Sequence, residues 1–162
     1  MDNRMGIGYD VHVLEAGESL VLGGVEISYD KGTKGHSDGD VLIHAVVDAL
    51  LGAAGLGDIG KFFSSEDDTW KDVSSLLFLE KSAEMLKNAG TEIVNVDSTI
   101  IIQEPRITPH IDKMIKNVAD ALSVEPNRIS IKATTTDGLG ITGRGEGVAA
   151  LAGLTHSELT HS

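Results

Sequence analysis

The feature that most constrains this chain is an apolar segment in which polar residues recur at every fourth position. Residues 41–51 are apolar except for His44 and Asp48, and Asp40 precedes them at the same spacing. Side chains four residues apart lie above one another on a single face of a helix. A helix that is apolar on its other faces lies inside a protein, so this polar stripe must meet compensating groups or a ligand, because a buried charge without a partner is costly.

The residues on either side of this segment carry signals for the two ends of a helix. Ser37 and Asp38 offer side-chain oxygens that accept hydrogen bonds from the free N–H groups at a helix start. Gly52 is a typical helix stop. We therefore predict a buried helix of about three turns that begins near Asp38 or Gly39.

A candidate metal site combines this helix with an amino-terminal strand predicted at residues 6–12. Asp10 and His12 are two residues apart in that strand, so their side chains point to the same side. With His44 they would form a set of two histidines and one carboxylate, which leaves coordination positions open as a catalytic Zn²⁺ or a non-haem Fe²⁺ requires. Asp48 is expected to orient the His44 ring through its other nitrogen. The alternative is that His44 is a hydrogen-bonded histidine of the core.

Length and composition predict one domain, residues 1–162, with a real hydrophobic core, because 41% of its residues are hydrophobic. The formal net charge of −12 argues against a nucleic-acid partner, since affinity for phosphate backbones comes from clustered Lys and Arg. No apolar run reaches the roughly 18 residues of a membrane span, so no membrane partner is expected. No targeting segment is recognisable, and we expect a cytoplasmic protein of bacterial type or the mature form of a plastid protein.

Strand and helix patterns interleave along the chain. Gly23 and Gly24 separate two short apolar runs and predict a hairpin. The other expected elements are a loop over 31–35, a helix over 73–89, a strand over 92–103 with Val94 and Val96 on one face, a helix over 109–122, and strands over 127–133 and 148–154. This order predicts an α+β fold, a mixed β-sheet with helices packed on one face in a split βαβ (ferredoxin-like) arrangement. Subunit association is expected to cover the other face.

Two loops have compositions that suit a binding site. Residues 64–72 are polar and are expected to form a mobile cover over a site. Asp58, which precedes them, suits a binding site and the capping of a short turn equally well. Residues 134–137 read Thr-Thr-Thr-Asp and lead into a glycine-rich stretch at 138–147. Hydroxyls and glycine-rich backbone amides both bind oxyanions, so this loop either binds phosphate or is an ordinary turn.

Six sequence blocks, taken together and in order, extend this interpretation. The chain resembles the 2-C-methyl-D-erythritol 2,4-cyclodiphosphate synthase family of the non-mevalonate isoprenoid pathway, and the match runs from about Met5 to Leu154. Each block alone is a weak signal, whereas six in the same order are highly specific. The blocks are Asp10-Val11-His12, His36-Ser37-Asp38-Gly39-Asp40, His44, Gly57-Asp58-Ile59-Gly60, Lys132-Ala133-Thr134-Thr135-Thr136 and Thr142-Gly143-Arg144-Gly145-Glu146-Gly147.

The resemblance implies a phosphorus–oxygen lyase that assembles as a homotrimer with its active sites between subunits. The implied substrate is a cytidine diphosphate compound, 4-diphosphocytidyl-2-C-methyl-D-erythritol 2-phosphate. Its 2-phosphate attacks the β-phosphate of the same molecule, which forms the cyclic diphosphate and releases CMP without a protein nucleophile. The implied cofactors are one Zn²⁺ per subunit, and Mg²⁺ or Mn²⁺ bound with the substrate diphosphate.

Carried over to this sequence, the resemblance implies roles for individual residues. Asp10, His12 and His44 would hold the Zn²⁺, and His36 and Thr135 would stabilise the transition state. Residues 102–108 would form the cytosine pocket, largely with backbone groups. The residues placed around the substrate are Asp10, His12, His36, Ser37, Asp58, Ile59, Gly60, Phe63, Ser64, Ser65, Glu66, Asp67, Ile102, Gln103, Glu104, Pro105, Arg106, Ile107, Thr108, Thr134, Thr135, Thr136, Asp137, Ile141 and Arg144.

The chain departs from the family pattern at three places. Asp137 stands where a Glu usually binds Mg²⁺, Ile141 replaces a common aromatic residue, and residues 63–65 read Phe-Ser-Ser in place of Phe-Pro-Asp. Arg144 and Glu146 match positions at the trimer axis, where they would either bind an isoprenoid diphosphate or form an ion pair between subunits.

The metal triad alone also permits two other classes of protein. One is an oxygenase or a metal-dependent phosphohydrolase. The other is a trimeric binding module with a structural metal, although an open coordination position argues against a structural role.

Overall fold

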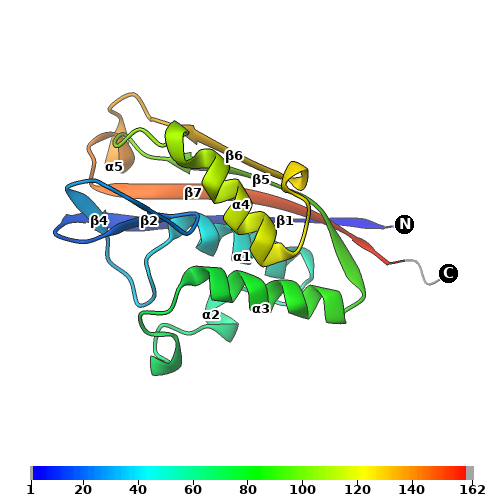
Figure 1. Cartoon of the computed structure of the whole chain (residues 1–162). Coiled ribbons are helices and arrows are strands. Elements are labelled where there is room, and N and C mark those ends of the chain that lie inside the picture. Colours follow the sequence, from blue (N-terminus) through cyan, green and yellow to red (C-terminus); the bar gives the residue numbers. More distant parts are fainter. Residues whose placement is uncertain (1, 160–162) are drawn as a thin grey trace.

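The computed structural model describes residues 2–159 and contains a five-stranded mixed sheet with a separate two-stranded hairpin (Figure 1). The strands are β1 (Asn3–Ala16), β2 (Leu20–Leu22), β3 (Val25–Ile27), β4 (Lys31–Thr33), β5 (Thr91–Ile101), β6 (Ile129–Thr134) and β7 (Gly147–Glu158). The α-helices are α1 (Val41–Ala53), α2 (Ile59–Phe62), α3 (Ser75–Asn88), α4 (Ile111–Leu122) and α5 (Gly140–Gly143). Short 3₁₀ helices lie at Asp68–Trp70, Thr108–His110 and Pro126–Arg128.

The sheet has the strand order β4-β1-β7-β5-β6, and only the β5–β6 pair is parallel. The predicted mixed α+β fold is therefore confirmed. The split βαβ arrangement is wrong, because β5 and β6 are direct neighbours connected through α4. β7 lies between β1 and β5. Its residues 148–150 are buried on both faces, which suits that central position.

The predicted buried helix is α1, which packs on β1 and β7 on the same face of the sheet as α3 and α4 (Figure 1). Leu42, Ile43, Leu50 and Leu51 are fully buried. Each such side chain contributes roughly 1.5–3 kcal/mol relative to leaving it in water. Burial of this helix therefore organises the core, as its apolar sequence requires.

The start of α1 differs from the prediction. Asp40 is the N-cap and accepts a hydrogen bond from Ile43 N at 3.1 Å. Its two carboxylate oxygens also accept from the backbone N–H groups of Gly23 (3.0 Å) and Gly24 (2.7 Å) in the hairpin turn. Burial, aided by repulsion from Asp38, raises the pKa of Asp40 to about 6 in spite of these bonds. The helix also continues through position 52, where glycine was expected to end it.

Two glycines of β1 let α1 approach the strand closely. A Cβ atom added to Gly8 would lie 1.9 Å from the carbonyl oxygen of Ala45, and one added to Gly6 would lie 1.9 Å from that of Ala49. Real Cβ atoms essentially never come closer than 3.0 Å to another heavy atom, and ordinary contact begins near 3.4 Å. The strand backbone and the helix backbone are therefore in direct contact, and only glycine fits at these two positions.

The opposite face of the sheet is left uncovered, and apolar side chains gather there. Met5 and Ile7 are each 70% exposed. The other large apolar residues of this face are Tyr9, Val11, Val13 and Leu151. Within residues 2–159, no helix is long and apolar enough to cross a membrane.

Two local predictions are corrected. A register shift between Ile93 and Asn95 in the β5–β7 pairing changes which side chains of β5 face the core. Ile93 is therefore buried, and Val94 is 38% exposed. Residues 31–33, expected in a loop, form β4 because they pair with Leu14–Ala16, an extension of β1 beyond the predicted strand.

Candidate active site

Three side chains suited to metal binding converge where β1 passes the first turns of α1. His12 Nε2 lies 2.8 Å from Asp10 Oδ2, and His44 Nδ1 lies 3.2 Å from each of those two atoms. Ligand atoms held about 2.0–2.1 Å from a tetrahedral Zn²⁺ are about 3.3 Å apart. All three residues are partly buried, and their spacing fits one shared divalent ion.

The ionisation of this cluster also favours a bound cation. Burial disfavours a charge on Asp10, but hydrogen bonds from His12 and His44 outweigh burial and hold the pKa of this carboxyl well below its usual range. Burial likewise disfavours a charge on His12, yet the hydrogen bond and the attraction to Asp10 raise the pKa of its imidazole. A proton or a metal ion at the meeting point of the three groups relieves the same imbalance.

The residue predicted to orient His44 is not the one that does so. Asp48 accepts a hydrogen bond from Ile59 N at 2.7 Å, because the chain returns over α1 at the start of α2. The second ring nitrogen of His44, Nε2, lies 2.8 Å from Ser75 Oγ and 3.2 Å from Ser37 Oγ. Serine hydroxyls from two separate segments therefore take the place that was assigned to Asp48.

A cavity of about 260 Å³ opens beside this cluster. Phe63 and Phe78 form part of its wall, stacked with ring centroids 4.7 Å apart, and Trp70 packs edge-on against both. His36 Nε2 donates to the carbonyl oxygen of Asp67 at 2.8 Å, which ties the 64–72 loop to the cavity. The lining residues are Asp10, His12, His36, Ser37, His44, Asp48, Ile59, Gly60, Phe63, Ser65 and Phe78.

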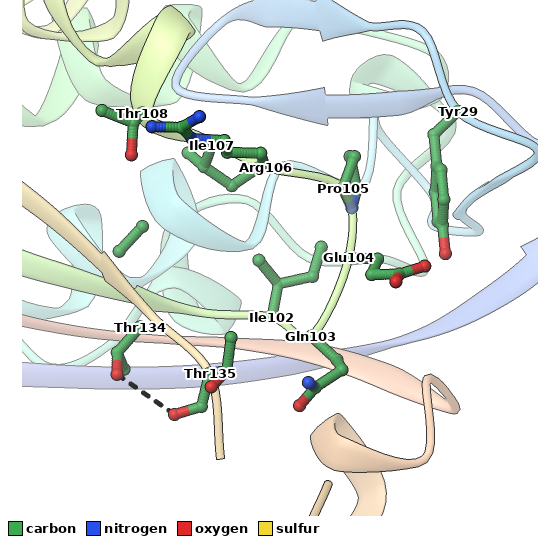
Figure 2. Close-up of a pocket in the computed structure, with 11 residues that line it drawn as sticks. Tyr29, Ile102, Gln103, Glu104, Pro105, Arg106, Ile107, Thr108, Thr134 and Thr135 are labelled. Carbon is green, nitrogen blue, oxygen red and sulfur yellow. Dashed lines mark hydrogen bonds between the residues drawn. The ribbon is translucent and has the colours of Figure 1, made fainter. Parts of the chain in front are cut away.

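A second cavity, of about 530 Å³, lies at the carboxyl ends of β5 and β6. The chain that leaves β5 curves around it, with Tyr29 on one side and Thr134 and Thr135 on another (Figure 2). Ile102 N donates to the carbonyl oxygen of Thr134 at 3.0 Å, which holds this segment against β6. The lining residues are Tyr29, Ile102, Gln103, Glu104, Pro105, Arg106, Ile107, Thr108, Ala133, Thr134 and Thr135.

The threonine-rich loop after β6 is a compact turn fixed by its own side chains. Thr136 Oγ1 donates to the carbonyl oxygen of Leu139 at 2.6 Å and lies 2.9 Å from Thr142 Oγ1. Asp137, with a φ of 53°, donates its backbone N–H to Thr135 Oγ1 at 3.2 Å. Gly138 N donates to the side chain of Gln103 at 3.1 Å, so the loop is joined to the second cavity.

Comparison with known proteins identifies the group to which this arrangement belongs. A family model described as the YgbB family matches residues 3–156. The chain belongs to the YgbB family.

Relatives in the YgbB family range from single enzymes to fused ones. A 2-C-methyl-D-erythritol 2,4-cyclodiphosphate synthase from Syntrophomonas wolfei is 55% identical over 92% of this chain and 95% of its own length. Among solved structures, IspF of Plasmodium falciparum in complex with CDP has a TM-score of 0.86 and 32% identity, over 98% of this chain and 97% of that one. The bifunctional IspDF of Campylobacter jejuni has a TM-score of 0.93 and 39% identity over 98% of this chain, which spans only 43% of that longer protein.

Most of the residues assigned to the site from the sequence lie at one of the two cavities, which have no lining residue in common. The structure brings the three predicted metal ligands together, and it places residues 102–108 around the larger cavity. Asp58 caps α2 by accepting from Lys61 N at 3.1 Å. Arg144 pairs with Glu146 of the same chain, with Nε 2.8 Å from Oε1. The predicted residues that line neither cavity are Asp58, Ser64, Glu66, Asp67, Thr136, Asp137, Ile141 and Arg144.

Four residues at this candidate site were not assigned from the sequence, among them Ala133, which lines the larger cavity. Phe78 and Ser75 are buried near the start of α3, and Tyr29 lies on the loop before β4. From the sequence alone, Phe78 could be predicted only to be an apolar residue of a helix. The one available signal was that aromatic residues are rare in this chain. Its three Phe and one Trp all gather beside the cavity of about 260 Å³ at the Asp10–His12–His44 cluster, which we call the metal-side cavity.

Proposed function

We propose that this chain converts 4-diphosphocytidyl-2-C-methyl-D-erythritol 2-phosphate into 2-C-methyl-D-erythritol 2,4-cyclodiphosphate with release of CMP. Relatives that cover nearly the whole chain are named for this synthase. The observation that carries the proposal is the meeting of Asp10, His12 and His44 at spacings suited to one ion, beside a cavity.

The metal-side cavity would hold the reacting diphosphate. A Zn²⁺ held by Asp10, His12 and His44 would supply Lewis-acid polarisation of a phosphate oxygen. His36 donates its Nε2–H to the carbonyl oxygen of Asp67, so Nδ1 is the ring atom left for phosphate, to which it would donate in the doubly protonated imidazolium form. Ser37 Oγ lines the same cavity and would donate to a second oxygen. Donors fixed in this way stabilise charge that develops during ring closure without having to reorganise.

The larger cavity would hold the cytidine end of the substrate. Its volume of about 530 Å³ is in the range of small-molecule sites, and its wall offers backbone groups from residues 102–108. Thr135 at its edge would contact the phosphates as the second transition-state stabiliser. Asp137 follows in the chain and would provide the carboxylate for Mg²⁺ or Mn²⁺, which favour oxygen ligands. The similar structure of Plasmodium falciparum IspF in complex with CDP supports a cytidine ligand.

The remaining predicted contacts belong to the same proposal. Gly60 lines the metal-side cavity, and Asp58 lies two residues before it, where both would contact the sugar hydroxyls. The polar residues 64–67 would cover the bound substrate. Ile141 in α5 and Arg144 at its C-cap follow the threonine-rich loop and would contact the substrate from there.

We also propose that three copies assemble through the uncovered face of the sheet. Met5, Ile7 and Tyr9, at alternate positions of β1 and so on one face of the sheet, are each more than half exposed, which is unfavourable for an isolated chain. The two cavities share no lining residue, and we propose that one substrate lies between the metal-side cavity of one subunit and the larger cavity of its neighbour. Arg144 and Glu146 would then lie near the threefold axis, where an isoprenoid diphosphate is the further candidate ligand.

The proposed function is tested by removing one metal ligand. His44→Ala should leave a folded protein with the parent's assembly state, without bound zinc and without release of CMP detected by phosphorus NMR. His110→Ala is the matched control, since His110 lines neither cavity. Turnover that is unchanged in His44→Ala, or equally reduced in both variants, would remove the metal triad from the mechanism.

A further inference from the structure

The partly buried Asp38 and the fully buried Ser75 form a pair behind the Asp10–His12–His44 cluster. Ser75 has no exposed surface and lies in the first turn of α3, with its Oγ 2.8 Å from His44 Nε2. Its hydroxyl donates to Asp38 Oδ1 through a short hydrogen bond, and its backbone N–H donates to Asp38 Oδ2 at 2.9 Å. Asp38, Ser75 and His44 therefore form one continuous chain of hydrogen bonds that ends at the proposed metal site.

We propose that Asp38 and Ser75 are positioning residues that fix the tautomer of His44, with the proton on Nε2 and the lone pair of Nδ1 directed at the metal. This inference rests on the proposed metal site. It assigns a role to two residues that neither bind the ion nor contact the substrate. His44 would contact the metal ion directly, whereas Asp38 and Ser75 would act on the ion only through His44.

The direction of the hydrogen bonds carries the proposal. Asp38 serves only as an acceptor here, because Ser75 N, Ser75 Oγ and Asp40 N all donate to it. A serine hydroxyl has a single proton, so Ser75 Oγ presents lone pairs to His44. A hydrogen bond from His44 to Ser75 Oγ therefore requires the hydrogen on Nε2. A neutral imidazole has one N–H, so Nδ1 then holds a lone pair, and a metal ion shared with Asp10 would replace the bond from Nδ1 to Asp10 Oδ2 at 3.2 Å.

Ser37 is a weaker candidate for the same task. Its Oγ lies 3.2 Å from His44 Nε2, which is longer than the bond to Ser75, and it lines the cavity where a ligand would engage it. Ser75 is closed off from that cavity by its burial. The contact to Ser75 therefore persists whatever occupies the site. Asp48 is excluded because it binds Ile59 N.

As a result, His44 would bind the metal more strongly and keep a fixed ring orientation. A histidine that donates its second N–H to a fixed acceptor keeps one tautomer and one ring orientation, and removal of such a partner typically weakens metal binding by about 10–100-fold. Asp38 lies before α1 and Ser75 lies at the start of α3, 37 positions later in the chain. The pair therefore also couples the position of the His44 ring to the packing of α3.

The experiment compares Ser75→Ala with Ser82→Ala. Ser82 is a buried serine of the same helix whose hydroxyl donates to the carbonyl oxygen of Phe78, so its loss has a similar structural cost. Nitrogen NMR of the zinc-free protein, at a pH where His44 is neutral, reports the tautomer, and chelator competition reports zinc affinity. We expect the Nε2–H form to be equally populated in the parent and in Ser82→Ala. Ser75→Ala should shift the proton toward Nδ1, where Asp10 accepts it, and should bind zinc about 10–100-fold more weakly.

A further variant and the parent protein separate the possible failures. Ser75→Thr retains the hydroxyl and should retain the Nε2–H tautomer, including under conditions where Ser75→Ala is too unstable to measure. If Ser75→Ala matches Ser82→Ala in both tautomer and affinity, the positioning pair is overturned. If the parent itself binds zinc no better than His44→Ala, the proposed metal site fails instead, and the tautomer measurement still decides the role of Ser75.

Discussion

The contact between β1 and α1 makes Gly8 the most informative position for a test that links packing to the metal site. In Gly8→Ala the new Cβ would lie 1.9 Å from the carbonyl oxygen of Ala45, whereas ordinary contact begins near 3.4 Å. The atom that it meets belongs to a helix backbone and cannot rotate away. Relief of the clash therefore requires β1 and α1 to separate by about 1.5 Å at this point.

This displacement has different consequences for stability and for metal binding. Overpacking of a core typically costs about 1–3 kcal/mol, which is less than the roughly 5–15 kcal/mol that stabilises a domain. The protein should therefore stay folded. Asp10 and His12 project from the strand and His44 from the helix, at 3.2 Å across the gap. Metal sites tolerate only about 0.2 Å in their ligand distances, so most of the zinc affinity should be lost.

The assay measures urea unfolding and zinc content for Gly8→Ala and for Gly52→Ala. Gly52 is exposed within α1, and a Cβ added there meets no heavy atom within 4 Å. That control should gain about 0.5–1 kcal/mol, because alanine favours the helix over glycine, and it should keep its zinc. If Gly8→Ala retained parental stability and zinc content, the close approach of strand and helix would not be what positions the triad.

Two further predictions concern carboxylates. Asp137→Asn should raise the Mg²⁺ concentration needed for half-maximal CMP release while leaving zinc content unchanged, and superimposable Mg²⁺ titrations would remove Asp137 as a ligand. Asp40 has a folded-state pKa raised from 3.8 to about 6, so its protonation favours the folded protein below about pH 4, and that contribution is lost as pH rises through about 6. The difference in unfolding free energy between the parent and Asp40→Asn should therefore fall over this interval, and a flat or rising difference would contradict the assignment.

The sequence predicted those features that depend on local pattern. The apolar run at residues 41–51 could only be a buried helix, and its spacing placed His44 on the polar stripe. The period of a strand put Asp10 and His12 on one side. The grouping of Asp10, His12 and His44 could be predicted because a strand and a helix that pack face to face leave few other ways to arrange three such side chains.

The features that were wrong depend on partners distant in the sequence. Ser37 and Asp38 have the composition of helix caps, but their side chains are engaged by His44 and by Ser75. Asp40 then takes the capping role and also anchors the β2–β3 turn. Capping rules consider only neighbouring backbone groups, so they cannot detect that a hydroxyl or carboxylate is already committed to another element.

The arrangement of β1 explains why the candidate metal site lies at the start of α1. The face of β1 that meets the helix carries Gly6 and Gly8, then Asp10 and His12. The glycines admit the helix backbone opposite Ala45 and Ala49, which leaves no room there for a ligand. Beyond them the strand continues past the first turns of α1, where space returns and His44 faces the two remaining side chains. The close contact of Gly6 and Gly8 with α1 therefore leaves no cavity beside Ala45 and Ala49. The same contact sets the distance between β1 and α1 at which Asp10, His12 and His44 meet.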